Sequence, residues 1–172
     1  MAELERLDGA EITVGIHADE GAHEGLDKTG NPAGVTVAMV GAWHEGGTRY
    51  MPARPWLAPS IDENRPEIDR LFDHSLSIAL AGGDVRVSLG LVGEFAQQKV
   101  QAKIRDSDPG WAPLAESTKR AKAKLVRGSK AEGRKAKERR VEFLAGDGNP
   151  LVDTGQLIQS QRYVVNLGGL GG

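Results

Sequence analysis

The chain contains no cysteine, which excludes disulfide bonds and thiolate metal sites. Aromatic residues make up only 5% of its 172 residues, so a single domain of this length has few large side chains for a core. No apolar run approaches the ~20 residues of a membrane-spanning helix, and the acidic start Met1–Arg6 is unlike a secretory signal. We therefore expect one domain, with no membrane partner, that gains burial by contacting copies of itself.

Neither sign of charge dominates the chain, which has 22 Lys and Arg, 24 Asp and Glu, and a formal net charge of −2. The basic residues are nevertheless concentrated, because residues 119–140 hold eleven of them against Glu132 and Glu138. We predict that this segment contacts DNA or an acidic partner through Lys124, Arg127, Lys130, Arg134, Lys135, Lys137, Arg139 and Arg140.

Three interpretations of the basic segment stay open. It is a solvated charged loop, a docking surface for an acidic protein (another copy included), or a phosphate-binding surface whose affinity falls steeply with salt. No aromatic residue interleaves with its lysines, which disfavours base stacking and makes any nucleic-acid binding independent of sequence.

Hydrophobic periodicity predicts an α+β fold: a small antiparallel sheet packed against two long helices, with a proline-rich extended arm and a basic loop. Ile12, Val14 and Ile16 alternate with polar or small residues, as is typical of a strand over 11–16, and a second strand is expected near 160–166. The expected single domain spans residues 1–166, with a loop over 17–34, a basic insertion over about 119–145 and a glycine-rich tail over 167–172.

Apolar residues at helical spacing predict a short helix over 35–45 and long helices near 65–82 and 84–106. Gly90 and Gly93 cost roughly 1 kcal/mol each inside a helix, so we expect them to permit a close helix contact. The first long helix carries a clear apolar stripe, formed by Ile68, Leu71, Phe72, Leu76, Ala79 and Leu80.

Two capping boxes compete at the start of the first long helix. The pair Ser60 and Glu63 would place Pro66 inside the helix, where it breaks a hydrogen bond. The pair Asn64 and Glu67 places Pro66 in the first turn, where its missing N–H does no harm. We therefore expect a tight turn over 60–64, followed by the helix.

Three prolines within eight residues restrict the segment Pro52–Pro59. Each fixes φ near about −65° and pushes the preceding residue, Ala58 among them, toward an extended conformation. Such an arm is stiff before it meets a partner, so ordering it costs little entropy. We predict a subunit or partner interface made of Arg49, Tyr50, Met51, Arg54, Trp56 and Leu57.

The alternative is that Trp56 fills the core of its own chain while Arg54 pairs with a nearby carboxylate. The extended character of the arm favours exposure or an interface. On that interpretation we expect Trp56→Ala to leave the isolated fold mostly intact.

Three sequence blocks carry a family resemblance. They are Trp43-His44-Glu45-Gly46-Gly47 with Pro52-Ala53-Arg54-Pro55-Trp56-Leu57, then Trp111-Ala112-Pro113-Leu114 with Thr118-Lys119, and then Pro150-Leu151-Val152-Asp153-Thr154-Gly155-Gln156-Leu157. In this order they resemble the phage tail-completion or neck proteins, a group that includes the virion morphogenesis proteins of Mu-like phages and the minor tail proteins of lambda-like phages. The chain departs from the family pattern at Gly47, where an aromatic residue is common.

The resemblance implies a structural virion protein, assembled in the host cytoplasm, that joins head to tail as a homo-oligomeric ring with a hexamer as its expected size. The implied partners are other copies, a head-side connector or head-closure protein, a tail terminator or tail tube protein, and genomic DNA in the channel. The implied function is assembly, not catalysis. The alternative is a sequence-nonspecific nucleic-acid-binding protein that acts through residues 119–140.

Candidates for catalysis or metal binding are few. His17 and His23 lie six positions apart among carboxylates, but this spacing matches no established ligand motif. Asp153-Thr154-Gly155 matches an aspartic-protease triplet, which needs a second carboxylate to share a proton, so a helix cap at Asp153 is the better interpretation. We predict no catalytic, cofactor-binding or metal-binding residues, and an enzyme with a metal in the 17–24 loop stays open as a third class.

Overall fold

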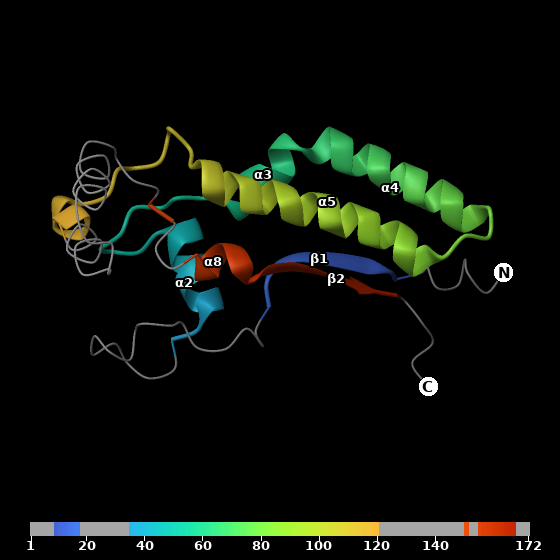
Figure 1. The fold of residues 1–172 in the computed structure, drawn as a ribbon, viewed down its shortest axis with the longest axis horizontal. Helices are drawn as coiled ribbons and strands as arrows, with labels where there is room; N and C mark the ends of the chain where they lie inside the picture. Colours follow the sequence, from blue (N-terminus) through green and yellow to red (C-terminus); the bar gives the residue numbers. More distant parts are fainter. Residues whose placement is uncertain (1–8, 18–34, 121–149, 152–154, 168–172) are drawn as a thin grey trace, which may run out of the picture.

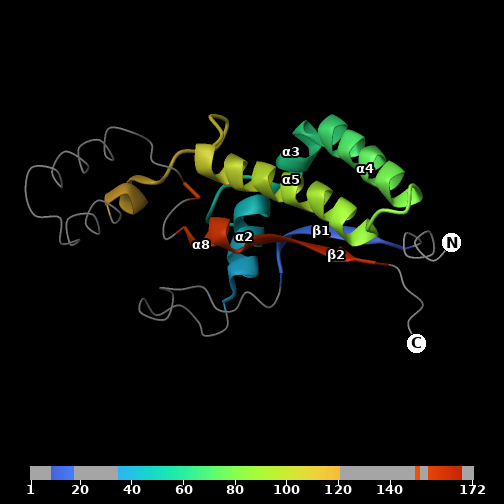
Figure 2. The same ribbon diagram turned by 45° about the vertical axis from the view of Figure 1, so that its right-hand side comes forward.

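A computed structural model describes residues 9–17, 35–120, 150–151 and 155–167 of the chain. Its named elements are β1 (Glu11–Ile16), α2 (Val37–Gly46), α3 (Leu57–Glu63), α4 (Arg65–Leu80), α5 (Val85–Asp106), α8 (Gln156–Gln159) and β2 (Gln161–Asn166). Figures 1 and 2 show α4 beside α5 as a helical hairpin, with α5 between α4 and the two strands. The predicted α+β class, with an antiparallel sheet against two long helices, is confirmed.

The two strands pair along their whole length. Val14 lies opposite Tyr163 and Ile12 opposite Val165, in antiparallel register. Since side chains alternate along a strand, these four residues share one face of the sheet, and that face packs on α5. β1 has the predicted bounds, and β2 begins one residue later than predicted.

The predicted tight turn over 60–64 is wrong, because the short helix α3 occupies Leu57–Glu63. Pro59 stands in its first turn, where a backbone N–H has no partner within the helix, so the proline is compatible with the helix. Ala58, which was expected to be extended because it precedes Pro59, is helical. The chain leaves this helix at Asn64, just before Pro66.

Helix α4 starts at Arg65 as predicted, with Pro66 in its first turn. The expected side-chain cap from Asn64 is absent. Its amide instead donates to the carbonyl oxygen of Ser60 at 2.8 Å, across the junction of the two helices. The position of the proline therefore determined the start of the helix, and the cap did not.

Buried side chains form two clusters along α5. The first contains Val37, Trp56, Val100, Ile104, Leu151 and Leu157. The second contains Ala79, Val85, Leu89 and Val165, with Leu167 packed against it. Leu167 therefore belongs to the domain, and of the predicted tail 167–172 only residues 168–172 lie outside the described part.

One of the two glycines of α5, Gly93, makes a close contact with the sheet. A Cβ atom added at Gly93 would lie 2.4 Å from Cδ2 of Tyr163, whereas one at Gly90 would meet only the Tyr163 hydroxyl, at 3.6 Å. The close contact expected here is thus made with a strand, at Gly93, where β2 approaches the α5 backbone.

Gly47 occupies a turn that requires glycine. Its φ is +72°, in the left-handed region, and an added Cβ would lie 2.7 Å from the backbone nitrogen of Ala53. An aromatic residue has no room at this turn.

Candidate interface site

Two side chains of the proline arm, Arg54 and Trp56, lie inside the subunit. Trp56 is 2% exposed and Arg54 is 4% exposed, and Trp56 belongs to the first core cluster. The expectation that these two side chains contact a neighbouring subunit is therefore corrected: both are covered by their own chain. Leu57 is half-buried and packs against the same cluster.

Arg54 holds a second segment of the chain in place. Its Nε donates to the carbonyl oxygen of Ala112 at 3.0 Å, and one terminal nitrogen donates to that of Pro113 at 3.2 Å. Burial lowers the pKa of the Arg54 guanidinium below its ordinary value. A buried cation is costly unless it is hydrogen-bonded, and here two backbone carbonyls accept from Arg54 where the alternative interpretation placed a carboxylate.

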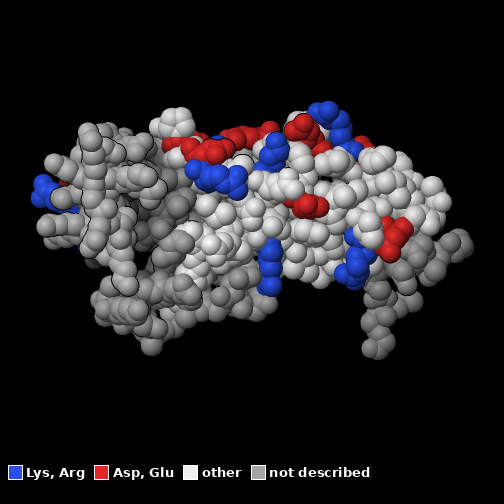
Figure 3. Space-filling model, in the orientation of Figure 1, with Lys and Arg blue, Asp and Glu red and all other residues white. Residues whose placement is uncertain are grey.

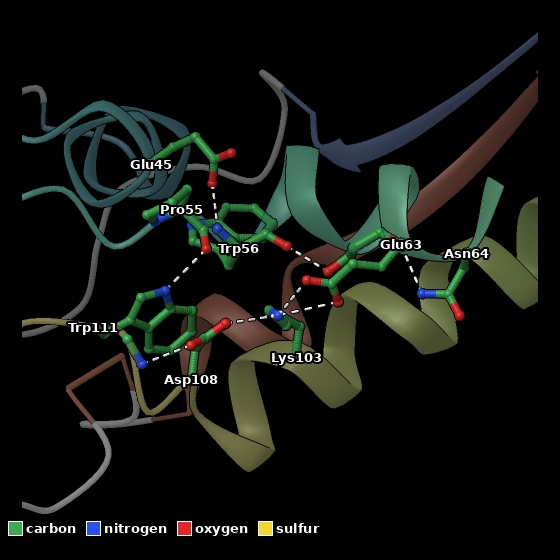
Figure 4. Close-up of polar contacts among 10 residues, drawn as sticks. Glu45, Pro55, Trp56, Glu63, Asn64, Lys103, Asp108 and Trp111 are labelled. Atoms are coloured by element: carbon green, nitrogen blue, oxygen red, sulfur yellow. Dashed lines mark hydrogen bonds and ion pairs between the residues drawn. The ribbon is translucent and has the colours of Figure 1, made fainter.

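Trp111 also bonds to the proline arm. Its indole Nε1 donates to the carbonyl oxygen of Pro55 at 3.1 Å, and its ring packs against the first core cluster. Figure 4 shows the bond from Trp111 to Pro55, with Trp56 next to Pro55.

The end of α2 caps α3. The carboxylate of Glu45 accepts the backbone N–H groups of Trp56, Leu57 and Ala58 at 2.7, 2.9 and 3.0 Å. These are three of the donors that a helix N-terminus leaves without partners, and a negative charge is favourable there. The sequence block around Glu45 is thus bonded directly to the one around Trp56.

Lys103 links α5 to α3 and to the loop that follows α5. Its ammonium lies 2.8 Å from Glu63 and 2.8 Å from Asp108, and its side chain is 17% exposed. Hydrogen bonds to Asp108 and Glu63 raise the pKa of Lys103, and the bonds from Lys103 and from the Gly110 N–H lower the pKa of Asp108. Figure 4 shows this pair of bonds beside Trp111.

The residues just before the arm form a rigid exposed turn. Thr48 and Met51 make an antiparallel bridge, with N···O distances of 2.8 and 3.3 Å, and the Thr48 hydroxyl accepts the N–H groups of Tyr50 and Met51. Tyr50 at its tip is 88% exposed, and the Arg49 guanidinium lies 5.6 Å from its ring centre. Of the predicted interface residues, Arg49 and Tyr50 are therefore presented to solvent, and Met51 is half-buried.

An apolar groove of about 760 Å³ opens on another part of the surface. Its walls include Ile12 and Val14 of β1, Ile68 and Phe72 of α4, and Val92 and Ala96 of α5, and α3 closes one end. The groove was not predicted, although the sequence contained a signal. Of the six residues in the apolar stripe of α4 only Ala79 is buried, while Phe72 and Leu80 are 44% and 60% exposed.

Acidic side chains gather over α3 and α4, along the upper edge of the view in Figure 3. The two helices carry five exposed carboxylates, from Asp62, Glu63, Glu67, Asp69 and Asp73, against the exposed Arg65 and Arg70. The eight predicted DNA or acidic-partner contacts, Lys124 to Arg140, lie outside the described residues.

The other candidates form no reactive site in the described part of the chain. There, no three His, Asp or Glu side chains lie close enough to hold a metal ion, and no helix combines the length and apolar character needed to cross a bilayer. His17 is near Thr13, with its Nε2 at 3.1 Å from the hydroxyl. His23 and Asp153 lie outside the described residues, and α8 follows Gly155 without a side-chain cap.

No protein-family model matches this chain, and neither the curated proteins nor the solved structures searched contain a match.

Proposed function

We propose that this protein is a structural component of a phage virion, located at the head–tail junction. Copies of the chain form a ring, with a hexamer as the expected size. The ring contacts the head-side connector or head-closure protein on one side and the tail terminator or tail tube on the other, around a channel for DNA. The protein acts by assembly and is not an enzyme.

One observation carries the proposal: the three sequence blocks that resemble the neck proteins meet in a single structural unit. Glu45 of the first block caps the helix that begins beside Trp56, and Arg54 and Trp111 join the first block to the second. Leu151 and Leu157 of the third block pack with Trp56. Segments that are about a hundred residues apart thus depend on one another, as expected if the pattern encodes a common core.

The contacts between subunits must then come from residues that are exposed on the surface of this core. The Thr48–Met51 turn is fixed by backbone and side-chain hydrogen bonds, so little entropy is lost when Tyr50 is buried by a partner. Tyrosine and arginine are also the side chains that most often dominate binding energies at interfaces. Many such contacts repeated around a closed ring add to one another.

The test is electron microscopy of particles from a phage that lacks this gene. We expect full heads and complete tails that do not join, because the missing ring forms the link. Normal, infectious virions would overturn the proposal.

A complementation series then tests the turn. We expect Tyr50→Ala to reduce incorporation into particles, and Val87→Ala, at a side chain that is 64% exposed on α5, to leave it unchanged. Both variants remove an exposed apolar group, so equal incorporation of the two would exclude Tyr50 as a contact.

A further inference from the structure

The outer edge of β2 is closed by side chains of α5. Gln97 accepts the backbone N–H of Tyr163 at 3.1 Å, and Arg86 donates to the carbonyl oxygen of Val165 at 3.2 Å. Gln101 reaches the carbonyl oxygen of Gln161 at 3.5 Å. These polar groups would otherwise offer a template to any passing strand.

The same contacts identify the free groups of β1. Since the backbone groups of Tyr163 and Val165 point away from β1, each pairs with the residue opposite without hydrogen bonds. The N–H and C=O groups of the opposite residues, Val14 and Ile12, therefore point away from β2. In the described part of the chain these groups have no hydrogen-bond partner.

The apolar groove runs beside this free edge. Ile12 and Val14 form one wall, and Ile68 and Phe72 of α4 form the other. On its floor, Val92 and Ala96 of α5 separate the two core clusters and belong to neither. The groove thus lies between α4 and the free edge of β1, where a third strand would pair.

The charge around the groove indicates what kind of strand fits. Asp62 lines it, with the Arg65 guanidinium 3.9 Å away, and the adjoining α3–α4 surface has five carboxylates against two guanidinium groups and the Lys103 ammonium, which pairs with Glu63. An incoming strand therefore needs apolar side chains at alternating positions and basic residues beside them. The sequence offers such a segment, Arg139-Arg140-Val141-Glu142-Phe143-Leu144, at the end of the basic run. Val141 and Phe143 are strand-forming residues at alternate positions.

We propose that segment Arg139–Leu144 of a second copy adds to the free edge of β1 as a third strand. Val141 and Phe143 fill the apolar groove, while Arg139, on the same face of the strand, meets the acidic surface of α3 and α4. This mode of binding obtains affinity from backbone hydrogen bonds and specificity from alternate side chains. The two contact surfaces differ, so the contact is heterologous and links copies head to tail into a ring or filament. The inference rests on the self-association in the proposed function.

Because the chain contains no cysteine, single cysteines can be introduced to test the docking by disulfide cross-linking. One full-length protein carries Phe143→Cys, and a second, of different size because of a tag, carries Phe72→Cys in the groove. The two are mixed under mild oxidation. We expect at least about tenfold more mixed disulfide than with Val87→Cys, an exposed control outside the groove, because docking raises the local thiol concentration toward the millimolar range. Ile68→Cys serves as a second groove variant if Phe72→Cys does not fold.

The absence of a mixed disulfide with either groove variant would overturn the inference, and so would equal yields with the groove and control variants. A third protein carries both Phe143→Cys and Phe72→Cys in one chain. A disulfide that forms only within this chain would also overturn the inference. The last result would assign the groove to the segment of the same copy.

The outcome is independent of the virion experiment. A specific mixed disulfide together with normal virions from the gene deletion would keep the docking and exclude the neck function. Unjoined heads and tails without a mixed disulfide would keep the neck function and exclude the docking.

Discussion

Glu45 and Trp56 are joined by a 2.7 Å hydrogen bond, in which the backbone N–H of Trp56 donates to Oε2 of the Glu45 side chain. The same carboxylate accepts the next two N–H groups, so a residue in α2 acts as the cap of α3. We expect Glu45→Ala to reduce the free energy of unfolding by about 1–2 kcal/mol, the usual cost of a lost cap. Urea denaturation followed by circular dichroism measures this change.

Glu94→Ala is the matched control for Glu45→Ala. Glu94 is exposed on α5 and contacts only the Gln98 side chain among the described interactions, at 3.3 Å. We expect its loss to change the free energy of unfolding by less than about 0.5 kcal/mol. Equal effects of the two substitutions would show that the Glu45 carboxylate does not cap α3.

Gly93 and Gly90 provide a pair of opposite substitutions in one helix. Alanine at Gly93 would place Cβ 2.4 Å from the Tyr163 ring, so we expect a loss of about 1–3 kcal/mol from overpacking. Alanine at Gly90 meets nothing closer than 3.6 Å, so we expect a gain of up to about 1 kcal/mol from helix propensity. Thermal unfolding of both variants measures the difference, and stabilisation by Gly93→Ala would contradict the close contact.

Trp56 lies in the core and Tyr50 on the surface, so their substitutions should affect stability differently. With Trp56 2% exposed, we now expect Trp56→Ala to cost about 3–5 kcal/mol of stability, in contrast to the mild effect expected from the sequence. Tyr50 is 88% exposed, so Tyr50→Ala should change stability by less than about 0.5 kcal/mol. Denaturation midpoints of the isolated protein give both values. A stable, fully folded Trp56→Ala variant would place this side chain outside the core.

Asp108 should make stability depend on pH in the acid range. Its pKa is lowered in the folded protein by hydrogen bonds from Lys103 and from the Gly110 N–H. The folded state therefore favours the carboxylate, and this stabilisation is complete above the unfolded pKa of about 3.9. It is lost as the pH falls through the lower, folded pKa. We expect Asp108→Asn to make stability less dependent on pH below about 4 than in the parent protein. Urea midpoints at several acid pH values test this, and parallel pH profiles would rule out the contribution.

Local patterns predicted the elements that local physics determines. The alternation of Ile12, Val14 and Ile16 placed β1, because side chains that share one face of a strand share one environment. Pro66 placed the start of α4, because a proline is tolerated only in the first turn. The turn predicted over 60–64 was wrong because the helix α3 forms there. The first turn of α3 is stabilised by the carboxylate of Glu45, which lies outside the local sequence pattern.

The sequence alone determined the α+β class, the two strands and the two long helices, since each depends on hydrophobic periodicity. Only the tertiary structure decided that Arg54 and Trp56 lie inside the subunit, that Tyr50 lies outside, and that a groove runs beside the free edge of β1. The reason is physical: burial and edge pairing depend on which distant segments pack together, and one segment's residue types do not specify its neighbours.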